Sequence, residues 1–373
     1  MHSRYTWLCL ALALVLSGSA LGQAPVSPTP QKGTVEQVKV HGKALEGNLE
    51  GDSPDRDVFV YLPPGYSANT SQRYPVVYML HGYGLTAERW MPFTKMADAA
   101  DKNIAAGVMK PMILVNPDAF TKYNGSMYSS SPTIGDWEAF IAEDLVSYVD
   151  SHYRTISDRM SRGLGGHSMG GYGTVRIGMK RPDVFSSMYI MSACCLLNNP
   201  GGGNRGGAGA RGDGVTPAPQ TATPPAQQAT APAAGRGGRG GQGGRGGRGN
   251  TQAAQAAAWS SNPNNPPDFY DLPTKDGQPV PAVVAKYLAN SPLAMVDQYL
   301  TNLKKYRAIM LEVGTQDTLA GSNRQLNQSF KTFGISHTFE EYEGDHTNRV
   351  AERIEQKVLP FFSNNLSFAA PAR

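Results

Sequence analysis

Cysteine is scarce in this sequence, and no cysteine has the spacing of a metal ligand. Only three of the 373 residues are cysteine, and two of them, Cys194 and Cys195, are adjacent. No C-x-x-C or H-E-x-x-H pattern occurs, so we expect neither a metal nor another cofactor. Adjacent cysteines rarely meet the Cα spacing of a disulfide, which favours an inert, buried pair at the end of a strand.

Long apolar segments are also absent. The longest near the start, residues 7–16, is shorter than the roughly 20 residues that cross a membrane as a helix. Arg4 precedes this segment and Ala20-Leu21-Gly22 follows it, which is typical of a secretory signal peptide. We therefore expect residues 1–22 to be removed near Gly22/Gln23. The protein is then secreted or periplasmic and has no stable membrane span.

The part of the chain expected to fold lacks a strong net charge. Residues 199–266 are almost entirely Gly, Pro, Ala, Gln, Asn, Thr and Arg, with repeats such as GRGGRGGQGGRGGRG. So few apolar side chains cannot offset the entropy lost on ordering, and we predict a disordered insert. The insert holds six arginines, so it accounts for the formal net charge of +4. The rest of the mature chain indicates no nucleic-acid-binding groove.

Strand patterns and helix patterns alternate along the remaining sequence. Strands are predicted at 56–64, 74–84, 111–118, 185–195, 307–317 and 337–346. Helices are predicted at 136–153, with Asp136 as N-cap, and at 172–185, 319–333 and 348–362. This order predicts one α/β domain over 23–373, with a mostly parallel sheet, helices on both of its faces, and the insert within it.

The motif GLGGHSMGGYGT, residues 163–174, lies between a predicted strand and a predicted helix. Ser168 is flanked as G-x-S-x-G by Gly166 and Gly170, the pattern of a nucleophile elbow. Such a turn strains the serine, and side chains two residues away would clash with the backbone. The start of the helix directs its free N–H groups toward the hydroxyl. We therefore predict Ser168 as a nucleophile rather than part of a flexible loop.

A serine needs a base, and the imidazole of that base needs a carboxylate. His346 follows the last predicted strand, whereas the other histidines are interpreted as packing or surface residues: His41, His81, His152, His167 and His337. Asp317 ends the strand before it and completes the chain order serine, aspartate, histidine. The other carboxylates considered are less suitably placed: Asp118, Glu312, Glu343 and Asp345.

An oxyanion hole formed by two backbone N–H groups is expected beside the serine. One is that of Met169, the residue after Ser168, and the other is that of Tyr83 in the loop after YMLHG. Because both donors belong to the backbone, substitutions of their side chains would test them poorly.

Five segments resemble one known family: VYLPPGY, RYPVVYMLHGYG, NGSMYSSSPTIGDWEAFIAEDLVSYVDSHYRT, GGHSMGGYGT and GDHT. The sequence is similar to the Putative esterase family, which includes S-formylglutathione hydrolases, enterochelin esterases, mycolyltransferases, and the feruloyl and acetyl-xylan esterases of carbohydrate esterase family 1. The resemblance covers 40–198 and 290–364 and implies an α/β-hydrolase fold. It places Ser168, Asp317 and His346 on the catalytic triad, and the insert and Gly165 depart from the family pattern.

The resemblance implies an exported serine carboxylic-ester hydrolase with an acyl-enzyme intermediate. The expected partner is a small-molecule or polysaccharide ester, such as a feruloyl or acetyl ester, with no nucleic acid bound. Ser126, Tyr128 and Trp137 would line the cleft if the family pattern holds. The alternatives are a mycolyltransferase-like acyltransferase, a siderophore esterase or, outside the enzymes, a nucleic-acid-binding protein acting through the Arg-Gly-Gly segments of the insert.

Overall fold

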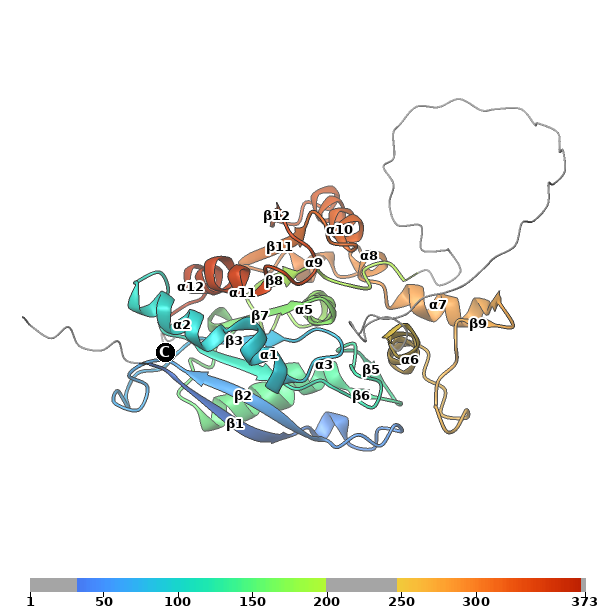
Figure 1. Cartoon of the computed structure of the whole chain (residues 1–373), viewed down its shortest axis with the longest axis horizontal. Helices are drawn as coiled ribbons and strands as arrows, with labels where there is room; N and C mark the ends of the chain where they lie inside the picture. The colour runs from blue at the N-terminus through green and yellow to red at the C-terminus, as the bar shows by residue number, and fades with distance from the viewer. Residues whose placement is uncertain (1–31, 199–246, 370–373) are drawn as a thin grey trace, which may run out of the picture. The chain divides into compact units, whose positions relative to one another are not determined.

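The computed structural model describes residues 32–198 and 247–369, and one eight-stranded sheet organises them (Figure 1). Its strands, in spatial order, are β1 (Thr34–His41), β2 (Asp55–Leu62), β4 (Ile113–Pro117), β3 (Val76–Leu80), β7 (Arg162–His167), β8 (Ser187–Met191), β11 (Ala308–Gly314) and β12 (Thr338–Tyr342). The strands β1 and β2 pair antiparallel with their neighbours, and all others run parallel. The predicted mostly parallel sheet is confirmed.

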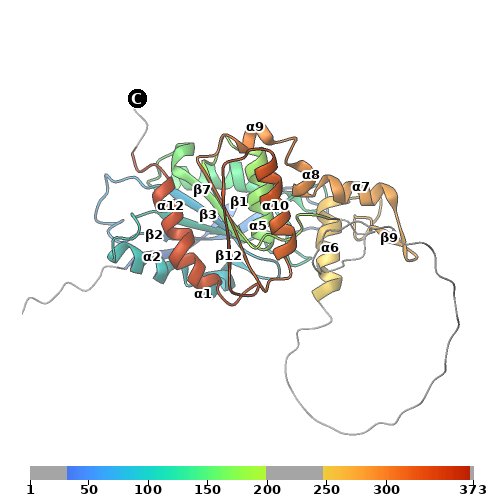
Figure 2. The same ribbon diagram turned by 90° about the horizontal axis from the view of Figure 1, so that it is seen from above.

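Helices cover both faces of the sheet (Figure 2). One face carries α1 (Ala87–Thr94), α2 (Met96–Ala105), α11 (Val350–Arg353) and α12 (Leu359–Asn365). The other carries α4 (Leu145–His152), α5 (Met169–Lys180), α7 (Pro281–Ala289) and α10 (Ala320–Thr332). Shorter elements connect them: α3 (Trp137–Ala139), α8 (Pro292–Met295), α9 (Leu300–Leu303), and the hairpins of β5 (Ser130–Ser131) with β6 (Gly135–Asp136) and of β9 (Thr274–Lys275) with β10 (Gln278–Pro279).

The continuous apolar pattern of β3 follows from burial on both faces. Val76, Tyr78 and Leu80 belong to one apolar core, and Val77 and Met79 belong to the other. Successive side chains of a strand point to opposite faces, so a strand between two helical layers needs apolar residues at every position.

The predicted helix over 136–153 is present with a local irregularity. Asp136 caps it as expected, because its side chain accepts a hydrogen bond from Ala139 N at 3.0 Å. Phe140–Asp144 then forms a π-helical turn before α4 begins. The apolar residues of this helix are turned inward: Phe140, Ile141, Leu145 and Val149 are fully buried, and Tyr148 is half-buried.

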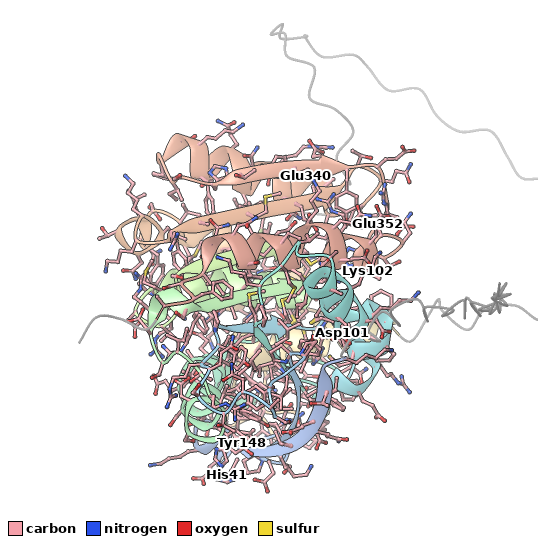
Figure 3. All side chains as sticks on the ribbon, turned by 90° about the vertical axis from the view of Figure 1, so that its left-hand side faces the viewer. His41, Asp101, Lys102, Tyr148, Glu340 and Glu352 are labelled. Carbon is pink, nitrogen blue, oxygen red and sulfur yellow. The ribbon has the colours of Figure 1, made fainter. Side chains whose placement is uncertain are left out.

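Helix α2 ties the start of the described chain to the sheet and to the C-terminal helices. Asp101 accepts hydrogen bonds from Gly33 N at 2.8 Å and from Tyr61 Oη at 2.7 Å. Lys102 pairs with Glu355, in the turn between α11 and α12. Figure 3 shows Asp101 and Lys102 on this side of the molecule, with Glu352 on the neighbouring helix. These contacts hold α2 against the first strands of the sheet and against the C-terminal helices.

The predicted boundary of the disordered insert, residue 266, lies too far toward the C-terminus. Residues 199–246 of it, like the predicted signal peptide, lie outside the described residues. The remainder contains helix α6 (Gly247–Trp259), in which Ala254, Ala257 and Trp259 are buried. Alanine is the strongest helix former, and Trp259 supplies the apolar area that anchors the helix. The average composition of residues 199–266 conceals both the alanine-rich stretch and this tryptophan.

Candidate active site

Ser168 occupies the turn between β7 and α5 in a backbone conformation that few residues adopt. Its φ is 58° and its ψ is −113°, outside the regions that are comfortable for residues with a Cβ atom. Ser168 N donates to Met191 O at 3.0 Å, and Cys194 N donates to Ser168 O at 3.1 Å. The neighbouring strand β8 and the loop after it therefore hold the strained turn in place.

The glycines around Ser168 are required by close backbone contacts. A Cβ atom on Gly170 would lie 2.0 Å from Leu80 O, and one on Gly166 would lie 2.5 Å from Gly170 O. Neither position can accept a side chain without moving the backbone. The G-x-S-x-G spacing is thus a consequence of how tightly α5 packs against β3 and β7.

The structure brings Ser168, His346 and Asp317 into one hydrogen-bonded chain. His346 Nε2 lies 2.9 Å from Ser168 Oγ, and His346 Nδ1 lies 2.7 Å from Asp317 Oδ2. His346 belongs to the loop after β12, and Asp317 belongs to the loop after β11. The Asp317 side chain is fully buried, whereas 34% of the His346 side chain is exposed. We refer to these three side chains as the Ser168 chain.

The carboxylate of Asp317 is held in its ionised form. Its burial opposes ionisation, but hydrogen bonds from His346 and from Leu319 N outweigh it and lower the pKa of Asp317. A charge that is buried beside Nδ1 keeps the imidazole in the tautomer whose Nε2 can accept the serine proton.

The other carboxylates weighed on sequence grounds have different partners. Glu312 accepts hydrogen bonds from Arg353 and Tyr189, while the side chains of Asp118 and Asp345 bind backbone amides of their own loops. No hydrogen bond joins any of these groups to His346 within the described residues. Among the described residues, Asp317 is the carboxylate that binds the far nitrogen of His346.

Two buried histidines, His167 and His81, hold backbone carbonyls next to the Ser168 chain by hydrogen bonds. His167 Nε2 lies 2.8 Å from His346 O, and the two rings are 4.7 Å apart. Burial, together with the neighbouring His346 ring, lowers the pKa of His167 to about 3, so its ring is neutral. His167 therefore supports the loop of His346 and is not a second base. The motif gave no signal for this role.

His81 fixes the peptide that carries the predicted oxyanion donor. His81 Nε2 accepts a hydrogen bond from Ala119 N at 2.8 Å, which leaves Nδ1 as the donor to Gly82 O at 2.9 Å. Gly82 O belongs to the same planar peptide as Tyr83 N, and the two point in opposite directions. Holding the carbonyl thus aims Tyr83 N–H the other way.

The predicted oxyanion amides lie close to the serine. A Cβ atom on Gly82 would lie 3.5 Å from Ser168 Cβ, so the loop with Tyr83 N runs directly beside the hydroxyl. Met169 N is the first amide of α5, where N–H groups have no partner within the helix. Within the described residues, neither amide donates to another protein group. Both are available to a bound oxyanion.

A cavity of about 270 Å³ opens over Ser168 and His346. The other residues that line it are uncharged or neutral: Gly82, Tyr83, Leu85, Phe93, His167 and Thr347. Phe93 stands at its edge with 39% of its surface exposed. Sequence reasoning missed Leu85, Phe93 and Thr347, because nothing in the local pattern distinguishes them from ordinary helix and loop residues.

The expectation that Ser126, Tyr128 and Trp137 line the cleft is wrong. All three are buried, and none borders the cavity. Tyr128 Oη donates to His81 O at 3.3 Å, and Trp137 Nε1 donates to Ile134 O at 2.9 Å. The polar segment around them turns inward because its hydroxyl and indole groups donate to backbone carbonyls, which a linear pattern does not reveal.

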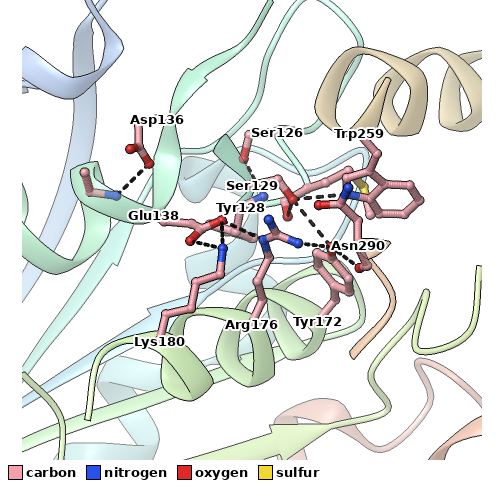
Figure 4. A network of polar contacts seen from close by, with 12 residues as sticks. Ser126, Tyr128, Ser129, Asp136, Glu138, Tyr172, Arg176, Lys180, Trp259 and Asn290 are labelled. Carbon is pink, nitrogen blue, oxygen red and sulfur yellow. Dashed lines mark hydrogen bonds and ion pairs between the residues drawn. The ribbon is translucent and has the colours of Figure 1, made fainter. Parts of the chain in front are cut away.

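A separate polar network lies on the flank of α5 that faces α6 (Figure 4). Arg176 Nε donates to Glu138 Oε1 at 2.7 Å, and Lys180 Nζ donates to Glu138 Oε2 at 2.7 Å. Arg176 also donates to Tyr172 Oη at 3.1 Å, and Tyr172 donates to Asn290 O at 2.9 Å. We call Glu138, Arg176, Lys180 and Tyr172 the Glu138 network.

Metal sites and membrane-spanning helices are absent from residues 32–198 and 247–369. No cluster of three or more His, Cys, Asp or Glu side chains in these ranges is arranged to hold a metal ion. No helix in them is long and apolar enough to cross a membrane.

The sheet and the strained serine between a strand and a helix define the class of the protein: it has the α/β-hydrolase fold. The chain belongs to the Putative esterase family, whose family model matches residues 53–350. The resemblance noted in the sequence is thereby confirmed.

Curated relatives match part of the chain. An endo-1,4-beta-xylanase/feruloyl esterase of Xylanibacter ruminicola is 33% identical over 138 residues, which are 36% of this chain and 19% of the relative. Esterase Rv1288 of Mycobacterium tuberculosis is 31% identical over 132 residues, which are 35% of this chain and 27% of that protein. The matches thus span about a fifth to a quarter of the length of these relatives.

Solved structures show the same fold over most of the chain. A ferulic acid esterase is 20% identical with a TM-score of 0.61, and the match covers 90% of this chain and all of that one. The feruloyl esterase module of Clostridium thermocellum, complexed with sinapinate, is 16% identical with a TM-score of 0.53, and the match covers 93% and 94% of the two chains.

Proposed function

We propose that this chain is a serine carboxylic-ester hydrolase in which Ser168 is the nucleophile, His346 the general base and Asp317 the group that orients His346. The observation that carries the proposal is the continuous Ser168 chain at the edge of an open cavity, with distances of 2.9 Å and 2.7 Å between its members. Family membership supports the same chemistry.

The geometry supports a two-step mechanism through an acyl-enzyme. His346 Nε2 takes the proton of Ser168 Oγ as the oxygen attacks the ester carbonyl. The amides of Tyr83 and Met169 stabilise the oxyanion, and His346 then protonates the departing alcohol. Water enters and gives a proton to His346 as it attacks the acyl carbonyl, and His346 returns that proton to Ser168 Oγ as the acid leaves.

The cavity favours an uncharged acyl group with an apolar part. The described residues that line it carry no charged side chain, and Leu85, Phe93 and Tyr83 offer an apolar and aromatic wall. A feruloyl or acetyl ester of a polysaccharide or a similar small acid fits this lining. The names of the relatives, which include a feruloyl esterase, support this substrate class.

The proposal is tested by hydrolysis of p-nitrophenyl acetate and methyl ferulate. We expect Ser168→Ala to lower kcat by roughly 10⁴-fold or more, because the nucleophile and its base act as a unit. Ser151→Ala, which removes an exposed serine on α4, is the matched control and should retain full activity. A Ser168→Ala protein that is folded and as active as Ser151→Ala would refute the nucleophile.

The acceptor of the acyl group is tested in the same experiment. A hydrolase releases acid in water alone at a steady rate. The acyl group of the ester is labelled so that the acyl-enzyme can be followed. If the acyl-enzyme accumulates and is discharged only when a sugar or another alcohol is added, the chain is an acyltransferase and the hydrolase assignment is wrong.

Export is proposed on the sequence pattern of residues 1–22, with cleavage near Gln23. Expression of the full chain in a bacterial host, followed by N-terminal sequencing of the exported protein, tests it. A chain that keeps its first 22 residues and stays in the cytosol would contradict the proposal.

A further inference from the structure

Two adjacent thiols lie on the loop after β8, next to the turn that carries Ser168. Both backbone polar groups of the residue before them, Ala193, are bound to the side chain of Asn323. Ala193 N donates to Asn323 Oδ1 at 3.1 Å, and Asn323 Nδ2 donates to Ala193 O at 3.0 Å. Cys194 N then donates to Ser168 O at 3.1 Å. The backbone that leads into the thiol pair is therefore tied both to α10 and to Ser168.

The backbone of this loop turns the two thiols toward each other. Successive side chains of an extended chain point to opposite sides. Cys195 instead has a φ of 59°, in the left-handed region, and its Sγ lies 2.8 Å from Cys194 Sγ. The two sulfurs therefore face each other, and a small movement would bring them to the roughly 2.05 Å of a disulfide bond. Both cysteines are free and half-buried.

We propose that Cys194 and Cys195 are a redox pair, a modification site at which a disulfide between neighbouring residues closes and reopens. The thiolate of one cysteine attacks a small disulfide R–S–S–R, forms a mixed disulfide and releases one R–SH. The second cysteine attacks the sulfur of the first, closes the ring and releases another R–SH. Two protein thiols lose two electrons and two protons, and one R–S–S–R becomes two R–SH.

The geometry makes this bond reversible rather than structural. Neighbouring Cα atoms are about 3.8 Å apart, below the usual span of about 4.4 to 6.8 Å across a disulfide. The ring is therefore strained, and strained disulfides are the more easily reduced ones. The proposal departs from the interpretation of the pair as inert, which was made from the sequence.

Closing the ring also affects the surroundings of Ser168. Gln255 Nε2 of α6 donates to Cys195 Sγ at 3.5 Å, and Cys194 N binds Ser168 O. Ring closure changes the backbone dihedral angles of both cysteines, so we expect it to move Cys195 Sγ away from Gln255 and to weaken the bond from Cys194 N to Ser168 O. We expect the oxidised protein to have a less reactive Ser168, by about fivefold, which is what the loss of one backbone hydrogen bond produces.

The first test uses the full chain with Cys9→Ser, in which Cys194 and Cys195 are the remaining cysteines. The folded protein is treated with oxidised glutathione and its intact mass is measured. We expect a loss of about 2 Da that dithiothreitol restores, with the bond mapped inside the peptide that holds both residues. A stable glutathione adduct, a disulfide between two chains or an unchanged mass would each overturn the pair.

The second test measures the coupling to Ser168 by the rate of labelling with a fluorophosphonate. We expect about fivefold slower labelling after oxidation and no change in the double variant Cys194→Ser/Cys195→Ser, made in the same Cys9→Ser chain and treated in the same way. Equal labelling of the reduced and oxidised proteins would overturn the coupling. The mass measurement does not depend on ester hydrolysis, so failure of the proposed function and failure of the redox pair are distinguishable.

Discussion

The Ser168 chain and the Glu138 network are built from the same kinds of group, yet only one is suited to chemistry. Each has a buried carboxylate, a basic side chain and a hydroxyl. In the Glu138 network both carboxylate oxygens are paired, and the hydroxyl of Tyr172 is bound to a backbone carbonyl. In the Ser168 chain the base is a histidine with a third of its side chain exposed to the cavity.

Two features therefore distinguish reactive polar side chains from structural ones. The reactive group has a base that titrates near neutral pH, and one of its members faces a cavity. Although burial disfavours its charge, Tyr172 and Glu138 raise the pKa of Arg176 above its usual range, so this guanidinium never gives up its proton. An imidazole can take and return a proton near neutral pH. The Glu138 network holds α5 in place, and the Ser168 chain uses the end of that helix.

The largest effect is expected from the carboxylate of the Ser168 chain. Asp317→Asn keeps the shape but loses the charge and favours the wrong tautomer of His346, so kcat for p-nitrophenyl acetate should fall by about 10⁴-fold. Asp345→Asn, a change at an exposed carboxylate whose amide contacts an asparagine oxygen can retain, is the control. Equal rates for the two variants would show that Asp317 does not orient the base.

The Glu138 network should respond in stability instead of rate. Arg176→Met leaves the buried Glu138 carboxylate with Lys180 alone, and we expect the free energy of unfolding to fall by about 3 kcal/mol. Urea denaturation measures this loss, and kcat per folded molecule should stay within about threefold of the wild type. A variant of normal stability with a collapsed kcat would erase the distinction between the two regions.

The region around Ser168 also differs from the Glu138 network in how its contribution to stability depends on pH, and His167 is the group that carries this dependence. Its pKa is about 3 in the folded protein against an ordinary value of 6.5, so the unfolded chain binds more protons between these pH values. Stability should therefore fall as the pH drops from about 6.5 toward 3, by up to roughly 1.4 kcal/mol per pH unit. Asp317 has a lowered pKa, so its own contribution is lost only below about pH 4.

His167→Gln tests this assignment, because glutamine can still donate to His346 O but does not titrate. Urea denaturation at several values between pH 4.5 and 6.5 gives the slope of stability against pH for both proteins. We expect a flatter slope in His167→Gln. Parallel slopes would mean that His167 is not the group that is held neutral.

The smallest effect concerns the open end of the Ser168 chain. Phe93→Ala removes an aromatic face from the edge of the cavity, and we expect about a tenfold loss of kcat/KM for methyl ferulate. The rate with p-nitrophenyl acetate should change little. Val108→Ala, at another exposed apolar residue, is the control. An equal loss on both esters would show that Phe93 supports the site without selecting the acyl group.

Much of the site was predictable because its signals are local. The glycines two residues on either side of Ser168 mark the turn within one short segment, although the contact that excludes a side chain at Gly170 comes from Leu80 O of β3. The apolar strand that precedes Asp317 is continuous in the sequence. The helix α6 and the inward turn of Ser126 and Tyr128 were not predictable in this way. Both depend on contacts with distant elements, such as that of Trp259 with Ser129 at 3.1 Å.

The sequence by itself determined the order of the elements, the strained serine and the residue types at the strand ends, because periodicity and glycine spacing act over a few residues. Only the tertiary structure decided that His81 and His167 hold the surroundings of His346 and that two neighbouring thiols face each other. Those outcomes depend on the packing of segments far apart in the chain, where small shifts decide which polar groups come within hydrogen-bond distance.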